Sequence, residues 1–282
     1  MAAATSRPHR RHLSAWIAGL LVAGIALALA GCGGGGGDGS YVHLTLQADL
    51  SDQIDDPSTV VSRISGSLAL RAEFFGAEDF SAEPSEDGRI SVKIKGPSPE
   101  EAQQLIGKTA YLEFRWPVIN DDGKIVCEAQ DGTEFSVKWE AVLYAGSDVR
   151  RVPECIGGPQ GRGKIRWAPA VGLVDQTRVL TGAYIQPDGV TVDRTSAPTL
   201  LVTFSEEGAR LLTEVTGQLV GLPLGIFVDD ELLAGPTISE PILSGTVAIA
   251  GLSIYEADIL AAQLNAGQLA APITMVGAEA AP

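Results

Sequence analysis

The chain has 282 residues, of which 45% are hydrophobic and 20% are charged. It is long enough for one large domain or two modest ones, and too apolar for a disordered acidic chain. Its 35 Asp and Glu residues outweigh 20 Lys and Arg residues, giving a net charge of −15 without any basic stripe, which argues against binding to DNA or RNA backbones.

Residues 1–31 have the organisation of a bacterial export signal. Three Arg residues form a positive segment, and an uncharged apolar run follows over residues 13–30. Small residues then lead into Cys32, which resembles the bacterial lipobox. That resemblance implies diacylglyceryl transfer to the Cys32 sulfur, cleavage before Cys32 and acylation of the new amine. The run is also long enough for an uncleaved membrane anchor, which stays open as an alternative.

Residues 32–40 are predicted to form a Gly-rich tether. Cleavage before Cys32 removes three Arg and no acid, so the net charge of −15 becomes −18. A flexible segment of this length has a reach of roughly 15 Å. A phosphate-binding loop needs a preceding strand, and here the lipobox-like segment stands in that place. We therefore expect an acidic body held to a membrane by two acyl chains and this tether.

Residues 41–117 are predicted to follow the order β-α-β-β-α-β, which is that of a ferredoxin-like α+β sandwich. Strict alternation of apolar and polar residues predicts a first strand over 42–50. A hairpin turning at Asp87-Gly88 leads into a strand over 90–94. The fourth strand is expected where Leu112, Phe114 and Trp116 share one face.

The two helices of this base have clear start and stop signals. The first carries its apolar residues at helical spacing, and the second opens with a capping box. The predicted boundary residues are Asp56 with Pro57 and then Gly76 for the first helix, and Ser98 with Glu101 and then Gly107 for the second.

Residues 118–174 are predicted to be a loop-rich insertion with short strand-like pieces such as 135–139. Cys127 and Cys155 lie in it, and outside the cytoplasm two cysteines most simply form a disulfide. Such a bond would stabilise the insertion by roughly 3.5 kcal/mol on a loop-entropy argument. Free thiols and a metal site are the alternatives, although zinc needs about four ligands and no His or further Cys is near.

Residues 175–278 are predicted to form a second α+β lobe, the head, and a closing strand. Helices begin at Ser205 and at the capping box of Ser253 and Glu256. The expected strands lie near residues 200–204, 224–228, 245–250 and 272–276.

Several segments, taken in order, resemble the large extracytoplasmic domain of the SecD family, which belongs to the Sec protein-export machinery. They are Val42-His43-Leu44-Thr45-Leu46-Gln47-Ala48, residues 97–114, Leu180-Thr181-Gly182-Ala183-Tyr184, residues 205–209 and 221–230, Glu240-Pro241-Ile242, residues 256–267 and Ala271-Pro272. The resemblance implies a base with a head inserted in it, so that the last strand returns to the first sandwich.

Two departures from the family pattern limit what can be carried over. SecD continues into several membrane helices tied to proton-driven export, and this sequence shows no second apolar run of that length. Proton coupling is therefore not carried over. The insertion with Cys127 and Cys155 is not part of the family pattern either.

No arrangement of residues in the sequence predicts catalysis, a cofactor or a metal. His43 is the one histidine that survives cleavage, and we expect it on the exposed side of a strand. The acidic run at 229–231 is interpreted as a turn, with a hard-metal site and acid/base catalysis as alternatives. The run at 120–123 is also interpreted as a turn. We therefore expect a protein that is not an enzyme, although an active site built from remote carboxylates is a distant third hypothesis.

Two hypotheses about function remain. The first is a lipoprotein on the outer face of the bacterial cytoplasmic membrane that binds translocating or unfolded polypeptide and assists Sec-dependent export. Its expected partners are exported preproteins and the translocon subunits SecYEG and SecDF, and its binding groove is expected at Ile238, Ile242 and Leu243. The second is a structural envelope lipoprotein that scaffolds another membrane protein through its insertion.

Overall fold

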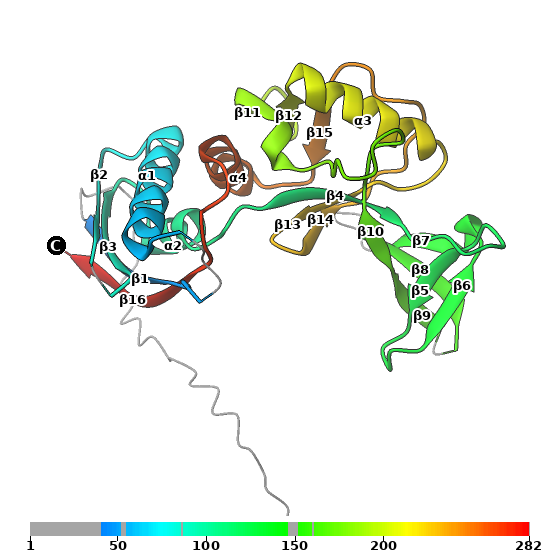
Figure 1. Ribbon diagram of the computed structural model, residues 1–282, viewed down its shortest axis with the longest axis horizontal. Coiled ribbons are helices and arrows are strands. Elements are labelled where there is room, and N and C mark those ends of the chain that lie inside the picture. The colour runs from blue at the N-terminus through cyan, green and yellow to red at the C-terminus, as the bar shows by residue number, and fades with distance from the viewer. Residues whose placement is uncertain (1–40, 52–54, 86, 146–151, 160, 282) are drawn as a thin grey trace, which may run out of the picture. The chain divides into compact units, whose positions relative to one another are not determined.

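The computed structural model describes residues 41–51, 55–85, 87–145, 152–159 and 161–281 (Figure 1). The predicted signal, Cys32 and the tether lie outside these ranges. Within them the chain is a mixed α/β, sheet-rich structure with four sheets and four α-helices. No helix in the described ranges is long and apolar enough to cross a bilayer.

The first sheet is antiparallel, with its strands in the order β16-β1-β3-β2. These strands are β1 (Tyr41–Ala48), β2 (Asp79–Pro84), β3 (Arg89–Lys95) and β16 (Ile273–Ala281). The predicted alternation along β1 is confirmed, because Leu44 and Leu46 are buried whereas His43 is exposed. Leu44 lies opposite Val92 of β3 on one side and Ala278 of β16 on the other.

Helices α1 (Pro57–Phe75) and α2 (Pro99–Ile106) begin and end where the sequence predicts. The Asp56 side chain accepts hydrogen bonds from the first free amides of α1. Gly76 ends α1 at a φ of 84°, a left-handed conformation that strains residues with a Cβ. Both halves of the Ser98–Glu101 capping box are formed at the start of α2.

The strand β4 (Leu112–Pro117) does not join β1 as the fourth strand of the base, so this expectation is wrong. It lies in a second sheet, in the order β10-β4-β13-β14, and Phe114 pairs there with Ile226. The edge beside β1 is taken by β16, as the family resemblance implied. Alternation along a strand shows which face is buried but not which strand lies beside it. The other members are β10 (Trp167–Pro169), β13 (Gly225–Val228) and β14 (Glu231–Ala234).

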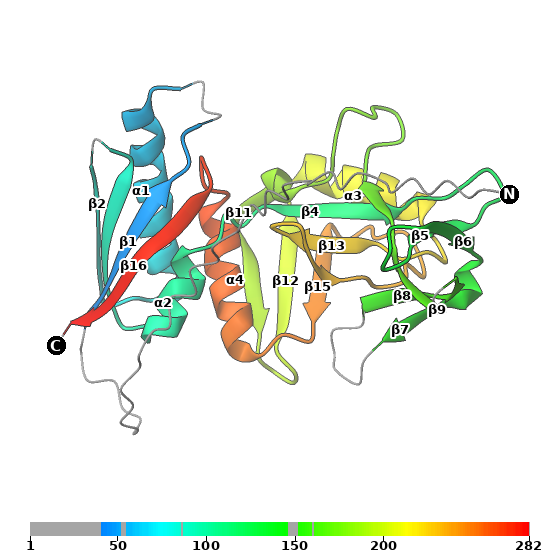
Figure 2. The same cartoon turned by 90° about the horizontal axis from the view of Figure 1, so that it is seen from below.

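A third sheet has the order β11-β12-β15, and α3 covers one of its faces (Figures 1 and 2). Its elements are β11 (Ile185–Asp193), β12 (Thr199–Phe204), β15 (Thr246–Ala250) and α3 (Glu206–Gln218). This sheet and the second one share a core, in which the rings of Phe114 and Phe204 meet edge to face at 5.7 Å. Strands β12 and β15 lie where the sequence predicts them, whereas β11 was not expected.

Helix α4 (Ile254–Ala266) contributes to two cores at once. Its Leu260 and Leu264 belong to the core shared by the second and third sheets. Its Ile259 and Ala262 belong to the core under the first sheet. Apolar residues on two different faces of one helix can be buried in two cores, and this is the case for α4.

The insertion is a fourth, five-stranded sheet in the order β6-β5-β9-β8-β7, rather than the loop-rich segment expected. Its strands are β5 (Ile125–Glu128), β6 (Glu134–Val137), β7 (Val142–Ala145), β8 (Val152–Gly158) and β9 (Gly161–Ile165), and 3-10 turns cover Trp139–Ala141 here and Gly182–Tyr184 further on. Strands this short are hard to recognise by periodicity. The Phe135 ring lies where a Cβ at Gly158 or Gly163 would stand, so the Gly content reflects close packing as well as turns.

Candidate functional site

The three residues expected to form a groove line one surface hollow. This hollow of about 560 Å³ lies between residues 236–244 and the strand β15, and Ile238, Ile242 and Leu243 are all among its lining residues. Ile238 is 5% exposed and joins the core, Ile242 is half-buried, and Leu243 is 78% exposed. The hollow therefore offers aliphatic surface that runs from the core outward to solvent.

The segment that forms one wall of the hollow is held through its backbone. Thr213 of α3 donates its hydroxyl to the Ile242 carbonyl at 2.8 Å, and the Ile242 amide donates to the Thr216 hydroxyl at 2.9 Å. The Ile238 amide donates to the Leu222 carbonyl at 2.9 Å. Because these backbone groups are hydrogen-bonded within the protein, the segment that forms this wall is held in a defined position.

The side chains that line the hollow are suited to noncovalent binding. Its lining combines aliphatic side chains and hydroxyl groups with one carboxylate, that of Glu240. Aliphatic surface with a few polar groups suits the apolar side chains and peptide groups of another chain. In the described ranges no group of three or more His, Cys, Asp and Glu side chains is placed to hold a metal ion.

The acidic run at 229–231 forms the turn between β13 and β14, as interpreted from the sequence. Asp229 and Asp230 both have positive φ, which a tight two-residue hairpin turn requires. The Asp229 carboxylate accepts hydrogen bonds from the amides of Ala110 (3.1 Å) and Tyr111 (2.9 Å). Asp230 forms an ion pair with Arg115. These carboxylates thus tie the hairpin to the start of β4.

Comparison with known proteins places these features in a family. Residues 164–271, which include the hollow, match the family model described as the P1 head subdomain of SecDF. The protein translocase subunit SecD of Dehalococcoides mccartyi (strain VS) is 32% identical over 245 residues, covering 82% of this chain and 46% of the relative. The chain carries a SecD-family extracytoplasmic domain.

A second relative agrees with this assignment, and two solved structures have a similar fold. The SecD subunit of Desulfurispirillum indicum is 32% identical over 209 residues, covering 73% of this chain and 38% of the relative. A crystal structure of SecDF in a super-membrane-facing form aligns with a TM-score of 0.57 and 23% identity, covering 86% of this chain and 30% of that one.

A structure described as a SecDF membrane component that enhances protein export aligns with a TM-score of 0.54 and 23% identity, covering 83% of this chain and 98% of that one. These two structural likenesses concern the fold. The chain spans less than half the length of the two curated SecD relatives.

The SecD-family domain contains a buried arginine, Arg71, whose role was not predicted from the sequence. Arg71 of α1 is fully buried and donates to the backbone carbonyls of the last turn of α2 and the residues after it, including Thr109 at 3.0 Å. Burial lowers the pKa of Arg71 to about 10, and the charge of Asp229 opposes that shift. Arg71 therefore stays protonated at neutral pH, at the negative end of a helix.

The sequence did contain a signal for this role. Arg71 falls on the buried stripe of α1 between Leu68 and Phe75, where an apolar residue is expected. A cation in such a place needs acceptors, and here the carbonyls at the end of α2 supply them. Periodicity alone does not show which element provides those acceptors.

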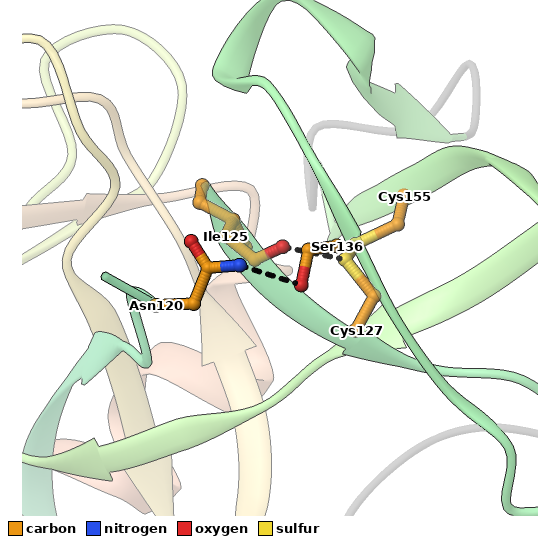
Figure 3. Close-up of a disulfide and its surroundings, with 5 residues drawn as sticks. All are labelled: Asn120, Ile125, Cys127, Ser136 and Cys155. Atoms are coloured by element: carbon orange, nitrogen blue, oxygen red, sulfur yellow. Dashed lines mark hydrogen bonds between the residues drawn. A yellow bond between two sulfur atoms is a disulfide. The ribbon is translucent and has the colours of Figure 1, made fainter. Parts of the chain in front are cut away.

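The predicted Cys127–Cys155 disulfide is present, so free thiols and a metal site on this pair are excluded (Figure 3). It joins β5 and β8, and both cysteines are fully buried in the small core of the insertion. Beside it, the side-chain amide of Asn120 donates to the Ser136 hydroxyl at 3.2 Å. Asn120 also accepts hydrogen bonds within the turn 120–123, which confirms that interpretation.

Proposed function

We propose that this SecD-family domain binds translocating or unfolded polypeptide and assists Sec-dependent protein export, without proton coupling of its own. The curated relatives are protein translocase subunits, which supports a role in protein export. The observation that carries the finer proposal is the hollow lined by Ile238, Ile242 and Leu243, within the part of the chain that matches the head. Folded proteins bury most of their large aliphatic side chains, whereas unfolded chains expose them and can place them in the hollow.

The proposal includes the place and the partners of the domain. Cys32 is proposed to carry the lipid that holds the protein on the outer face of the bacterial cytoplasmic membrane. Exported preproteins and the translocon subunits SecYEG and SecDF are the proposed partners. Radiolabelled palmitate should enter the wild-type protein but not the Cys32→Ser variant, and equal labelling of both would overturn the lipid anchor.

We also propose a division of the chain that the strand pairing refines. Residues 41–117 form the base, 118–174 the insertion and 175–278 the head with the closing strand. The sheet β16-β1-β3-β2 with α1 and α2 is interpreted as a ferredoxin-like base in which β16 stands fourth. In this interpretation β4 is the passage from the base into the head, because it pairs with β13.

The test is site-specific photo-crosslinking of the full chain in its own membranes. A photoreactive residue replaces Leu243 at the hollow, and a matched one replaces Leu70, which is 44% exposed on α1. We expect half-exported chains to be captured from position 243 and not from position 70. Capture of no exported chain from position 243, or equal capture from both positions, would overturn the proposal.

The insertion supports one alternative, a structural envelope lipoprotein. It is a separate sheet with its own core and disulfide, and it lies mostly outside the residues that match the head. Crosslinks from the insertion to envelope proteins unrelated to export, with none from position 243 to exported chains, would favour this alternative.

A further inference from the structure

Among the strands of the described ranges, β15 is hydrogen-bonded to a neighbour on one side only. In the sheet β11-β12-β15 it is the last strand, and Val247 and Ile249 lie opposite Val202 and Leu200 of β12. The Phe204 amide donates to the Gly245 carbonyl at 2.9 Å, so the backbone groups of Gly245, Val247 and Ile249 point toward β12. Because backbone groups alternate along a strand, those of Thr246, Ala248 and Ala250 point to the unpaired side.

For two of these three residues, the part of the chain that the structure describes supplies no partner on that side. The Ser244 hydroxyl lies within 3.3 Å of the Thr246 amide and 3.4 Å of its carbonyl, so Thr246 is covered locally. Within the described ranges no hydrogen-bond partner is seen on the open side of Ala248 or Ala250. Both alanines are exposed and small, whereas Val247 and Ile249 hold the strand in the core.

The opposite edge of the same sheet is closed. On β11, the Asn265 side chain accepts a hydrogen bond from the Val190 amide at 2.9 Å and donates one to the Val190 carbonyl at 2.8 Å. An amide side chain thus takes the position that a neighbouring strand would have. The pairing of β11 with β12 is also irregular between Ile185 and Val190, and irregular edges resist strand addition.

Edges of two other sheets carry residues that discourage pairing. The outer strand β2 contains Asp79, Glu83 and Pro84, and the outer strand β10 ends at Pro169. Charges and prolines are common protections of sheet edges. The sequence of β15, Thr-Val-Ala-Ile-Ala, has neither. Its edge is therefore open where others in this chain are guarded.

The open edge and the apolar hollow form one surface. Thr246, Val247 and Ala248 line the hollow together with Ile238, Ile242 and Leu243. A chain that hydrogen-bonded to β15 would place alternate side chains beside this aliphatic wall. Backbone pairing gives affinity without regard to sequence, and the wall selects apolar side chains.

We propose that β15 receives an extended segment of unfolded polypeptide as an added strand, with Ala248 as its central hydrogen-bonding residue. This proposal rests on the proposed function and specifies the mode of binding. The preferred segment alternates apolar residues with neutral or basic ones. A second copy of this chain would bring its own net charge of −15 to the same edge, which disfavours it as the occupant.

The test compares two variants and two peptides on the full chain in lipid nanodiscs. Ala248→Pro removes the outward amide and leaves the hydrogen bonds to β12 intact, as edge strands tolerate. Ala248→Val is the matched control, since it adds side-chain bulk and keeps the amide. The probe is a fluorescein-labelled peptide of alternating Val and Lys residues, used also with its backbone amides N-methylated.

We expect Ala248→Pro to bind the peptide about tenfold more weakly than Ala248→Val does, because only the proline variant lacks the outward amide. The N-methylated peptide should bind the wild-type protein at least as weakly, and this arm does not depend on the folding of a variant. Equal binding of both peptides by the wild type would overturn strand addition and leave the proposed function standing.

Two further outcomes would also overturn the inference. Failure of the wild type to bind either peptide would count against the proposed function as well. Self-association of the wild type that Ala248→Pro abolishes would show that a second copy occupies the edge instead.

Discussion

The sheet that contains β1 and the sheet of the insertion differ in what holds them together. Among the residues that the structure describes, the first shares a core of 19 buried residues with α1, α2 and α4, whereas the insertion has six, of which two are the bonded cysteines. Small cores rarely stabilise a fold alone, and disulfides commonly compensate in exported proteins. A covalent bond thus contributes in the insertion part of the stability that apolar burial supplies in the base.

The largest expected effect is on the insertion. Replacing both cysteines, as Cys127→Ala with Cys155→Ala, should lower its free energy of unfolding by about 3.5 kcal/mol, because the unfolded loop is no longer closed. Hydrogen exchange measures this as faster exchange of amides in β5, β8 and β9. Amides in β1 and β3 are the internal control. If they also exchange faster, the two regions are not independent.

A similar but slightly smaller effect is expected from the buried cation of the base. Arg71→Met keeps the apolar stem and leaves the carbonyls at the end of α2 without donors, which should cost about 3 kcal/mol. Urea unfolding followed by circular dichroism measures the loss. Arg71→Lys, which restores the charge and part of the reach, should recover some of it. Equal stability of Arg71→Met and wild type would show that the carbonyls are not dependent on Arg71.

Acid should weaken the base through the N-cap of α1. Hydrogen bonds from Ser58 and Thr59 hold the pKa of Asp56 below 3.8. The carboxylate is therefore protonated at a lower pH in the folded state than in the unfolded state. Stabilisation by the charged cap is therefore complete above pH 3.8 and is lost as the pH falls through the lowered pKa. Asp56→Asn keeps a cap that does not titrate. The advantage of wild type over this variant in urea midpoint should shrink from pH 6 to pH 3, and a constant difference would contradict the prediction.

The smallest effect on stability is expected in the head. Leu243→Ser removes an exposed side chain, so the free energy of unfolding should change by less than about 0.5 kcal/mol. Binding of unfolded polypeptide should nevertheless weaken, as fluorescence anisotropy with the Val and Lys peptide would show. Val174→Ser, at another highly exposed apolar residue, is the matched control. A large loss of stability in Leu243→Ser would place this side chain among the structural residues instead.

The sequence by itself determined the local features of this domain. Helix caps at Asp56, Ser98, Ser205 and Ser253, and the turn at Asp229, depend on residues only a few positions apart, and all were predicted. The alternation along β1 likewise identifies its buried face. The family resemblance further implied that the last strand returns to the first sheet, and the pairing of β16 with β1 confirms this.

Only the tertiary structure decided which elements meet. The pairing of β4 with β13, the carbonyls that receive Arg71 and the place of Asn265 on β11 all join residues distant in the chain. A hydrophobic pattern specifies which side chains leave water but not which strand or helix covers them, because many partners would bury them equally well. The open edge of β15 is of the same kind, since it results from the position of every other strand.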